Sequence, residues 1–304
     1  MTEQEKALNE LISYRDKLDG IEYDDIKILI KTSIRHIPIA LAKLYRGAAV
    51  DRVRLNEDKA FFTSQDELSY ITKKEIIDQS MKEFGRANKP HQPLFYGALE
   101  STKIKENRLT AYLETSTLIR DKEKILLEGE LFTLSRWRTT KELIIPEIVF
   151  SNEAIRNNPD TAVSFQKQYE FLKEEPMREI ALRQLQLFSE EFARKKNSHH
   201  DYKISVAYAD LLMNEGGHPG IVYPSVQSGY QGQNIVLRTD IVDKYLELTN
   251  VSTHRVHKNK MKSLMANYYH AVNFGDNNSN FTWNLEECDE EALIQKWSKH
   301  VSES

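Results

Sequence analysis

Apolar residues near the start of the chain recur at the three- and four-residue steps that place side chains on one face of a helix. The pattern is interrupted at Gly20 and again at Pro38, where a helix is expected to end or bend. It includes Leu8, Leu11, Ile12, Ile26, Ile28 and Leu29. We therefore expect residues 1–43 to form a helical N-terminal extension.

From about Leu44 onward the pattern changes to short β-prone runs separated by charged or proline-containing turns. The runs are LFYGAL, ELFTLSRW and LIIPEIVF. Residues 164–194 return to helical spacing, divided by Pro176, and ISVAYADLLMN predicts a further helix that ends at Gly216-Gly217. Helices and strands alternate irregularly, which predicts an α+β fold with a mixed β core and flanking helices.

The segment GIVYPSVQSGYQGQNIVL, from Gly220 to Leu237, reads as a loop held between two strands. Five of the eleven glycines in the chain lie within seventeen residues around it, between the β-prone runs IVY and IVL. Glycine gathers where the backbone turns tightly or approaches a ligand closely. We expect this loop to be functional, with Ser225 as the residue that contacts a substrate.

The remaining segments are more polar. Residues 241–304 have scattered aromatic side chains and predict a mainly helical C-terminal extension. His254 and His257, three residues apart, could share a helical face as metal ligands, but no carboxylate is near and a solvated basic helix face is the simpler interpretation. His199 and His200 read as part of an exposed link.

Composition narrows the class of protein. The formal net charge of −4 gives no general attraction to nucleic acid or anionic lipid, so we expect no direct DNA binding. The single cysteine, Cys288, cannot form an internal disulfide, which suits a reducing compartment. The N-terminus lacks the apolar centre of a signal peptide and no run is long enough for a membrane span, so a cytoplasmic protein without membrane contact is predicted.

Familiar catalytic signatures are missing. The chain contains no GxGxxG, no phosphate-binding GxxxxGK, no GxSxG, no CxxC and no HExxH. Polar residues instead stand singly inside β-like or apolar segments. They are Arg46 before a glycine, Arg86 and Asn88 in FGRANKP, Tyr96 in LFYGAL and Glu114 in LTAYLET.

Four segments, taken in order, resemble the successive blocks of the RES-domain family, named for its arginine, glutamate and serine. They are LYRGA, FGRANKPHQPLFYGAL, LTAYLET and HPGIVYPSVQSGYQGQNIVL. The resemblance covers roughly residues 44–240, which it marks as the catalytic domain. It implies a fold related to the diphtheria-toxin-like ADP-ribosyltransferases and cleavage of the nicotinamide-ribose bond of NAD by a bacterial toxin.

Carried over to this sequence, the resemblance assigns four catalytic residues, which are Arg46, Tyr96, Glu114 and Ser225. It also predicts contacts to NAD from Tyr45, Arg86, Asn88 and Asn234. Arg52 or Arg54 could take the place of Arg46, Glu100 or Glu106 that of Glu114, and Ser228 that of Ser225. No metal is expected, and NAD is the substrate rather than a resident cofactor.

These residue types suit the chemistry. A carboxylate such as that of Glu114 stabilises an oxocarbenium-like ribose, and arginines such as Arg46 and Arg86 bind a pyrophosphate in a fork. Tyr96 offers an aromatic face, and the Ser225 hydroxyl can position a substrate by hydrogen bonding; no motif supplies a histidine base that would make it a nucleophile.

Three functions remain open at this point. The first is an NAD glycohydrolase or phosphorolase acting as a toxin or defence effector, and the second is an ADP-ribosyltransferase that modifies a protein or nucleic acid. The third is a non-enzymatic module that binds NAD or ADP-ribose. The two extensions are expected to bind a helix-turn-helix antitoxin, to form a homodimer or to cover the pocket.

Overall fold

The computed structural model describes residues 1–33, 38–57, 61–174, 178–260, 262–273 and 280–284, together with residues 292 and 295. Pro176 and Cys288 lie outside these residues. The helices are α1 (Glu3–Ser13), α2 (Tyr23–Ser33), α3 (Gln65–Leu68), α4 (Lys74–Ser80), α5 (Asn107–Thr115), α6 (Asn152–Asn157), α7 (Pro159–Phe171), α8 (Arg178–Ala193), α9 (Lys203–Asp210) and α10 (Thr239–Tyr245). Shorter helical turns cover Leu18–Gly20, Leu172–Glu174, His199–Tyr202 and, as a π-helical turn, Leu211–Glu215.

The strands are β1 (Leu41–Leu44), β2 (Ala49–Leu55), β3 (Phe95–Leu99), β4 (Leu126–Thr139), β5 (Leu143–Pro146), β6 (Gly220–Pro224), β7 (Gln233–Leu237), β8 (Leu246–Lys258), β9 (Ser263–Val272) and β10 (Thr282–Asn284). The fold is therefore α+β, as the sequence predicts. None of the helices in the described part of the chain is both long enough and apolar enough to span a membrane.

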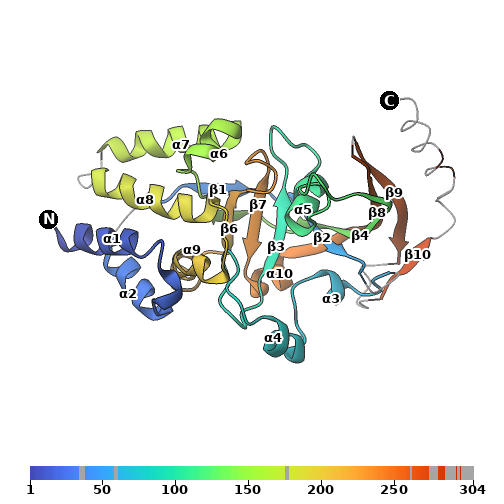
Figure 1. The fold of residues 1–304 in the computed structure, drawn as a ribbon, viewed down its shortest axis with the longest axis horizontal. Helices are drawn as coiled ribbons and strands as arrows, with labels where there is room; N and C mark the ends of the chain where they lie inside the picture. The colour runs from blue at the N-terminus through green and yellow to red at the C-terminus, as the bar shows by residue number, and fades with distance from the viewer. Residues whose placement is uncertain are drawn as a thin grey trace.

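Within the described residues, eight strands form one antiparallel sheet in the order β10-β9-β8-β4-β2-β3-β7-β6. Long strands β4, β8 and β9 gather at one end of the molecule and most helices at the other (Figure 1). The strands β10-β9-β8-β4-β2 meet the strands β3-β7-β6 at the β2-β3 pair. A single register pair, Asp51 with Ala98, joins these two strands. By contrast β2 pairs with β4 over its whole length. The sheet therefore opens beside this junction.

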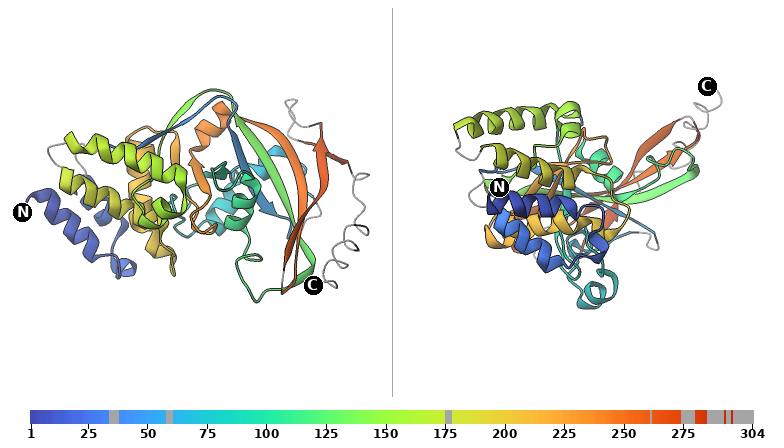
Figure 2. Two further views of the ribbon diagram at one scale, coloured as in Figure 1. Left: turned by 90° about the horizontal axis from the view of Figure 1, so that it is seen from above. Right: turned by 60° about the vertical axis from the view of Figure 1, so that its left-hand side comes forward.

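The predicted N-terminal helices are present as α1 and α2, but they are part of the main core. Leu8, Leu11, Ile26 and Ile30 are fully buried and pack in one hydrophobic cluster with the helices α8 and α9 and the strands β6 and β7. Figure 2 shows α1 and α2 beside α8 and α9 from two further directions. A pair of short strands, β1 and β5, follows as a separate two-stranded sheet.

The prediction of a mainly helical C-terminal extension is wrong for the residues that the structure describes. After the short helix α10, the chain forms the long strands β8 and β9 and the short strand β10, and β8 pairs with β4 in the centre of the sheet. Polar residues are frequent along β8: exposed ones alternate with buried ones near its start, and several polar residues near its end are themselves buried. The polar residues lowered the apparent hydrophobicity of the segment and hid the strand.

The structure also shows that the predictions for the histidines are wrong. His254 and His257 lie in β8, and both are buried, with 3% and 1% of their surface exposed, so they do not form a solvated helix face. The two nitrogens of His254 lie 2.9 Å from Ser252 Oγ and 2.9 Å from Asn267 Oδ1. His199 and His200 are half-buried in a short helical turn rather than exposed in a link.

Burial of His254 predicts a loss of stability in acid. Desolvation, assisted by the positive charge of Arg108, lowers its pKa from 6.5 to about 4. The unfolded chain therefore binds one more proton than the folded chain between these two pH values, and the free energy of unfolding falls as the pH falls through this window. We expect His254→Gln to reduce the stability difference between pH 7 and pH 4.5 by about 2 kcal/mol. Urea unfolding of both proteins at the two pH values measures this, and an unchanged difference would contradict it.

Candidate functional site

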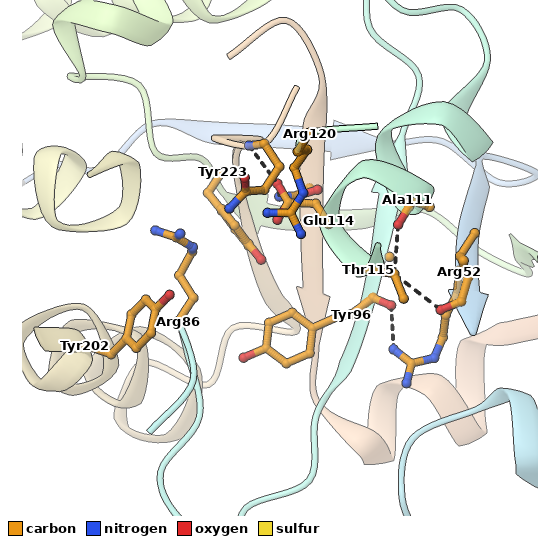
Figure 3. A pocket seen from close by; sticks show the side chains of 13 residues that line it. Arg52, Arg86, Tyr96, Ala111, Glu114, Thr115, Arg120, Tyr202 and Tyr223 are labelled. Atoms are coloured by element: carbon orange, nitrogen blue, oxygen red, sulfur yellow. Dashed lines mark hydrogen bonds between the residues drawn. The ribbon is translucent and has the colours of Figure 1, made fainter. Parts of the chain in front are cut away.

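A cavity of about 330 Å³ lies where β2 and β3 separate. Its volume is within the range of small-molecule sites. Its lining residues come from β2, β3, β6, β7, α5 and the segments around them: Arg52, Val53, Arg86, Tyr96, Gly97, Ala111, Glu114, Thr115, Arg120, Tyr202, Tyr223, Gln227 and Asn234. Figure 3 shows Arg86 and Tyr202 on one side, Arg52 on the other and Tyr96 between them.

Glu114 reaches the cavity from α5, which packs against β2, β3 and β7. One carboxylate oxygen, Oε1, accepts hydrogen bonds from Ser225 Oγ at 2.6 Å and from Asn234 Nδ2 at 2.9 Å. The backbone N–H of Gln227 also donates to it, at 3.5 Å. Within the described residues the other oxygen, Oε2, accepts no hydrogen bond and Glu114 forms no ion pair. One oxygen is thus anchored and the other is left available to a ligand.

The predicted loop between strands is a hairpin of β6 and β7, and a close approach to α5 fixes its position. Its base is closed by the N–H of Ser225, which donates to Gly232 O at 3.0 Å. A Cβ on Gly232 would lie 2.3 Å from Thr110 Oγ1 and 2.7 Å from Thr110 Cγ2 on α5. Only glycine allows the hairpin and the helix to come this close. The close approach brings Ser225 and Asn234 to Glu114.

Ser225 lies behind the carboxylate rather than at the cavity surface. It is fully buried and does not line the cavity. Its hydroxyl donates to Glu114 and accepts from the N–H of Ser228 at 3.2 Å, so both of its hydrogen-bonding roles are used inside the protein. The expectation that Ser225 itself contacts the substrate is therefore not met by this geometry. Ser225 orients the Glu114 carboxylate, and its buried hydroxyl is not placed to attack a substrate.

Tyr96 and Asn88 form one unit beside the cavity. The Tyr96 hydroxyl donates to Asn88 Oδ1 at 2.7 Å and accepts from the N–H of Ala87 at 3.2 Å. Burial raises the pKa of this phenol, so it stays protonated and keeps donating. Asn88 is buried and does not line the cavity. Tyr96 thus presents its ring to the cavity, and Asn88 holds it from behind.

Three arginines line the cavity without a carboxylate partner among the described residues. Arg52 Nη1 donates to Tyr96 O at 2.8 Å, while its Nε is buried without a partner, and burial together with nearby Arg54 lowers the Arg52 pKa to about 10. Arg86 Nη1 donates to Phe192 O. Arg120 Nε donates to Ser116 O at 2.8 Å.

Arg46 and Tyr45 are not brought to this cavity. Both are exposed in the turn between β1 and β2, and neither lines it. The arginine that reaches the cavity from this segment is Arg52, in the middle of β2, six residues after Arg46. The sequence left Arg52 open as an alternative, and the alternation in DRVRL is the signal that could have favoured it.

Arg120, Tyr202, Tyr223 and Gln227 line the cavity but were not among the predicted site residues. Tyr202 directly follows residues 195–201, which the sequence predicts to be an exposed link, and Tyr223 is a buried strand residue whose phenol pKa is raised by burial. A Cβ on Gly97 would lie 2.5 Å from Val50 Cγ1, so this wall stays free of a side chain. Among the described residues no group of three His, Cys, Asp or Glu is placed to hold a metal ion.

Three guanidinium groups and one carboxylate give the cavity walls a net charge of two positive units. Three tyrosine rings stand among them, at positions 96, 202 and 223. Such walls attract a ligand with two negative charges and flat ring systems, because guanidinium groups bind phosphate oxygens and aromatic faces bind rings. The carboxylate suits a centre that carries positive charge.

The fold and the site together define an α+β protein with an antiparallel sheet and a cationic, tyrosine-lined cavity that holds one anchored glutamate. No family model matches the sequence, and no curated protein matches it. The solved structures include a similar chain in the M. tuberculosis MbcT-MbcA toxin-antitoxin complex. The similarity covers 69% of this chain and 86% of that chain, at 13% sequence identity and a TM-score of 0.32.

Proposed function

We propose that this protein cleaves the nicotinamide-ribose bond of NAD. The observation that carries the proposal is the Glu114 carboxylate, anchored through Oε1 by Ser225 and Asn234 in a cavity with three arginines that have no carboxylate partner among the described residues. NAD matches both features, since its pyrophosphate carries two negative charges and the reacting ribose gains positive charge as the bond breaks. An anchored carboxylate stabilises that charge in the transition state more than in the ground state.

In the proposed reaction the bond between ribose C1′ and the nicotinamide nitrogen breaks, and its electron pair stays with the nitrogen. Nicotinamide, cationic while attached, leaves as a neutral molecule, and the ribose carbon becomes cationic. Glu114 supports this carbon electrostatically, while Arg52 and Arg86 bind the pyrophosphate and the tyrosine rings bind the bases. An oxygen of water or of inorganic phosphate then forms the new bond to C1′, and water also loses a proton.

Membership of the RES-domain family and an ADP-ribosyltransferase-like fold are part of the proposal. The order of the four sequence blocks supports them, and so does the position of Tyr96, Glu114 and Asn234 in the wall of one cavity, with Ser225 hydrogen-bonded to Glu114 behind it. On the same basis we propose a role as a toxin or defence effector with a cognate antitoxin. The proposed substrate is NAD, and no other cofactor enters the reaction.

The direct test is incubation of the purified protein with NAD, followed by chromatography for free nicotinamide, in buffers with and without phosphate. Release in both buffers supports a glycohydrolase, and release that requires phosphate supports a phosphorolase. Release that needs an added protein or nucleic acid, with label from adenylate-labelled NAD found in that macromolecule, supports the transferase instead. No release under any of these conditions contradicts the proposal.

Replacing Ser225 tests whether this residue orients Glu114 or attacks the substrate. Ser225→Ala removes the 2.6 Å bond to Glu114 and leaves the bond from Asn234. A hydrogen bond to a charged group contributes about 1.5–3 kcal/mol, so kcat should fall about ten- to a hundredfold with KM little changed. Steady-state kinetics of nicotinamide release measure both constants. Complete loss of activity in a folded variant would instead indicate that the serine attacks the substrate.

A further inference from the structure

The C-terminal end of α8 gathers an unusual set of charges next to the cavity. Glu191 is fully buried, and its carboxylate accepts from Arg15 Nε at 2.7 Å, Arg194 Nε at 3.0 Å and Lys196 Nζ at 2.5 Å. The side chain of Lys196 is 1% exposed. A carboxylate at a helix C-terminus is disfavoured by the helix dipole, and burying it adds a further cost. The three cations offset both.

Residues at the C-terminal end of α8 also contact Arg86, which lines the cavity. Arg86 donates from Nη1 to Phe192 O and, at 3.5 Å, to Arg194 O, and its guanidinium lies 5.3 Å from the centre of the Tyr202 ring. Lys196 Nζ donates to Asp201 O at 2.6 Å and lies 5.7 Å from the centre of the same ring. Arg86 and Tyr202 are the two residues that form one side of the cavity in Figure 3.

We propose that Glu191 is a positioning residue that holds Arg86 and Tyr202 in place for the substrate. Four cationic side chains meet here, at positions 15, 86, 194 and 196, and Glu191 is the carboxylate that contacts three of them. Without its charge these cations repel one another, and Lys196, buried at the base of the Tyr202 turn, loses its counter-ion. Through Arg15, which follows α1, the N-terminal helices act on substrate binding although they do not line the cavity.

The inference rests on the proposed cleavage of NAD for its kinetic test. Glu191→Gln keeps the shape of the side chain and removes the charge, so we expect KM for NAD to rise about tenfold with kcat within about twofold. Arg15→Gln, at a partly exposed residue, should raise KM in the same direction by a smaller factor. The matched control is the neighbouring Glu190→Gln, because Glu190 makes a single ion pair at 3.9 Å with Arg15. It should leave both constants unchanged.

A second measurement keeps the inference separate from the proposed function. Hydrogen exchange of the protein without substrate should be faster in residues 198–204 and 85–89 of Glu191→Gln than of wild type, and unchanged in the control. If wild type releases no nicotinamide, the proposed function fails and the exchange rates alone decide the positioning role. If Glu191→Gln does not fold, Arg15→Gln decides it. Unchanged KM and unchanged exchange in the folded variants overturn the inference, and so does a fall in kcat without a rise in KM.

Discussion

Replacing Glu114 by glutamine is expected to lower kcat for nicotinamide release about a thousandfold, which corresponds to about 4 kcal/mol of transition-state stabilisation. Glutamine keeps an oxygen that can accept from Ser225 Oγ and Asn234 Nδ2, so the anchoring contacts can persist and the lost quantity is the negative charge. Binding of NAD should change little, because the ribose carries its positive charge mainly in the transition state. Single-turnover kinetics together with calorimetric binding separate the two effects.

The two carboxylates that the sequence left as alternatives serve as controls for this experiment. Glu100 and Glu106 have side chains that are 61% and 64% exposed, and they pair with Lys105 and Arg108 at the surface. Neither lines the cavity. Glu100→Gln and Glu106→Gln should therefore retain wild-type kcat within about twofold. If either control loses as much activity as Glu114→Gln, or if Glu114→Gln stays active, the assignment of the carboxylate is wrong.

Much of the site could be predicted where local sequence fixes local geometry. The glycine-rich run after Gly220 predicts a tight connection between two short strands, and the structure forms a β6-β7 hairpin there. LTAYLET predicts a helix with one buried face, and α5 has this form, with Thr110, Ala111 and Tyr112 buried. Of the residues that the resemblance assigned, Tyr96, Glu114 and Asn234 line one cavity, Ser225 contacts Glu114 from behind it, and Arg46 lies elsewhere.

The errors arise where side-chain location depends on partners far away in sequence. Arg46 and Arg52 lie six residues apart at the start of the predicted β core, and only the pairing of β2 with β3 and β4 decides which of them faces the cavity. Tyr202 follows a run of polar residues, yet Arg86, more than a hundred residues earlier, lies beside its ring in the cavity wall. His254 and His257 resemble a solvated helix face in the sequence, but β8 lies between β4 and β9 in the sheet and both histidines are buried. Tertiary contacts of this kind leave little trace in local composition.

The burial of Arg52 in the cavity wall has an energetic cost for the protein. Arg52 has a buried Nε without a hydrogen-bond acceptor, and its lowered pKa reflects the unfavourable burial of its charge. Buried polar groups without partners destabilise a fold by about 1–3 kcal/mol each. Such groups concentrate at binding sites, where a ligand supplies the missing partner. The cost at Arg52 is thus best explained by an anionic ligand.

This reasoning gives opposite predictions for stability and activity when Arg52 is replaced. Arg52→Gln can still donate a hydrogen bond toward Tyr96 O but removes the buried charge, so the melting temperature of the free protein should stay the same or rise. The kcat/KM for NAD should fall at least a hundredfold, because the pyrophosphate loses a charged, forked donor. Arg46→Gln, at the exposed turn, should change neither quantity. Thermal unfolding and initial rates of wild type, Arg52→Gln and Arg46→Gln test both predictions. A larger loss of activity in Arg46→Gln than in Arg52→Gln would contradict the assignment to Arg52 and support Arg46, the residue that the sequence blocks favoured.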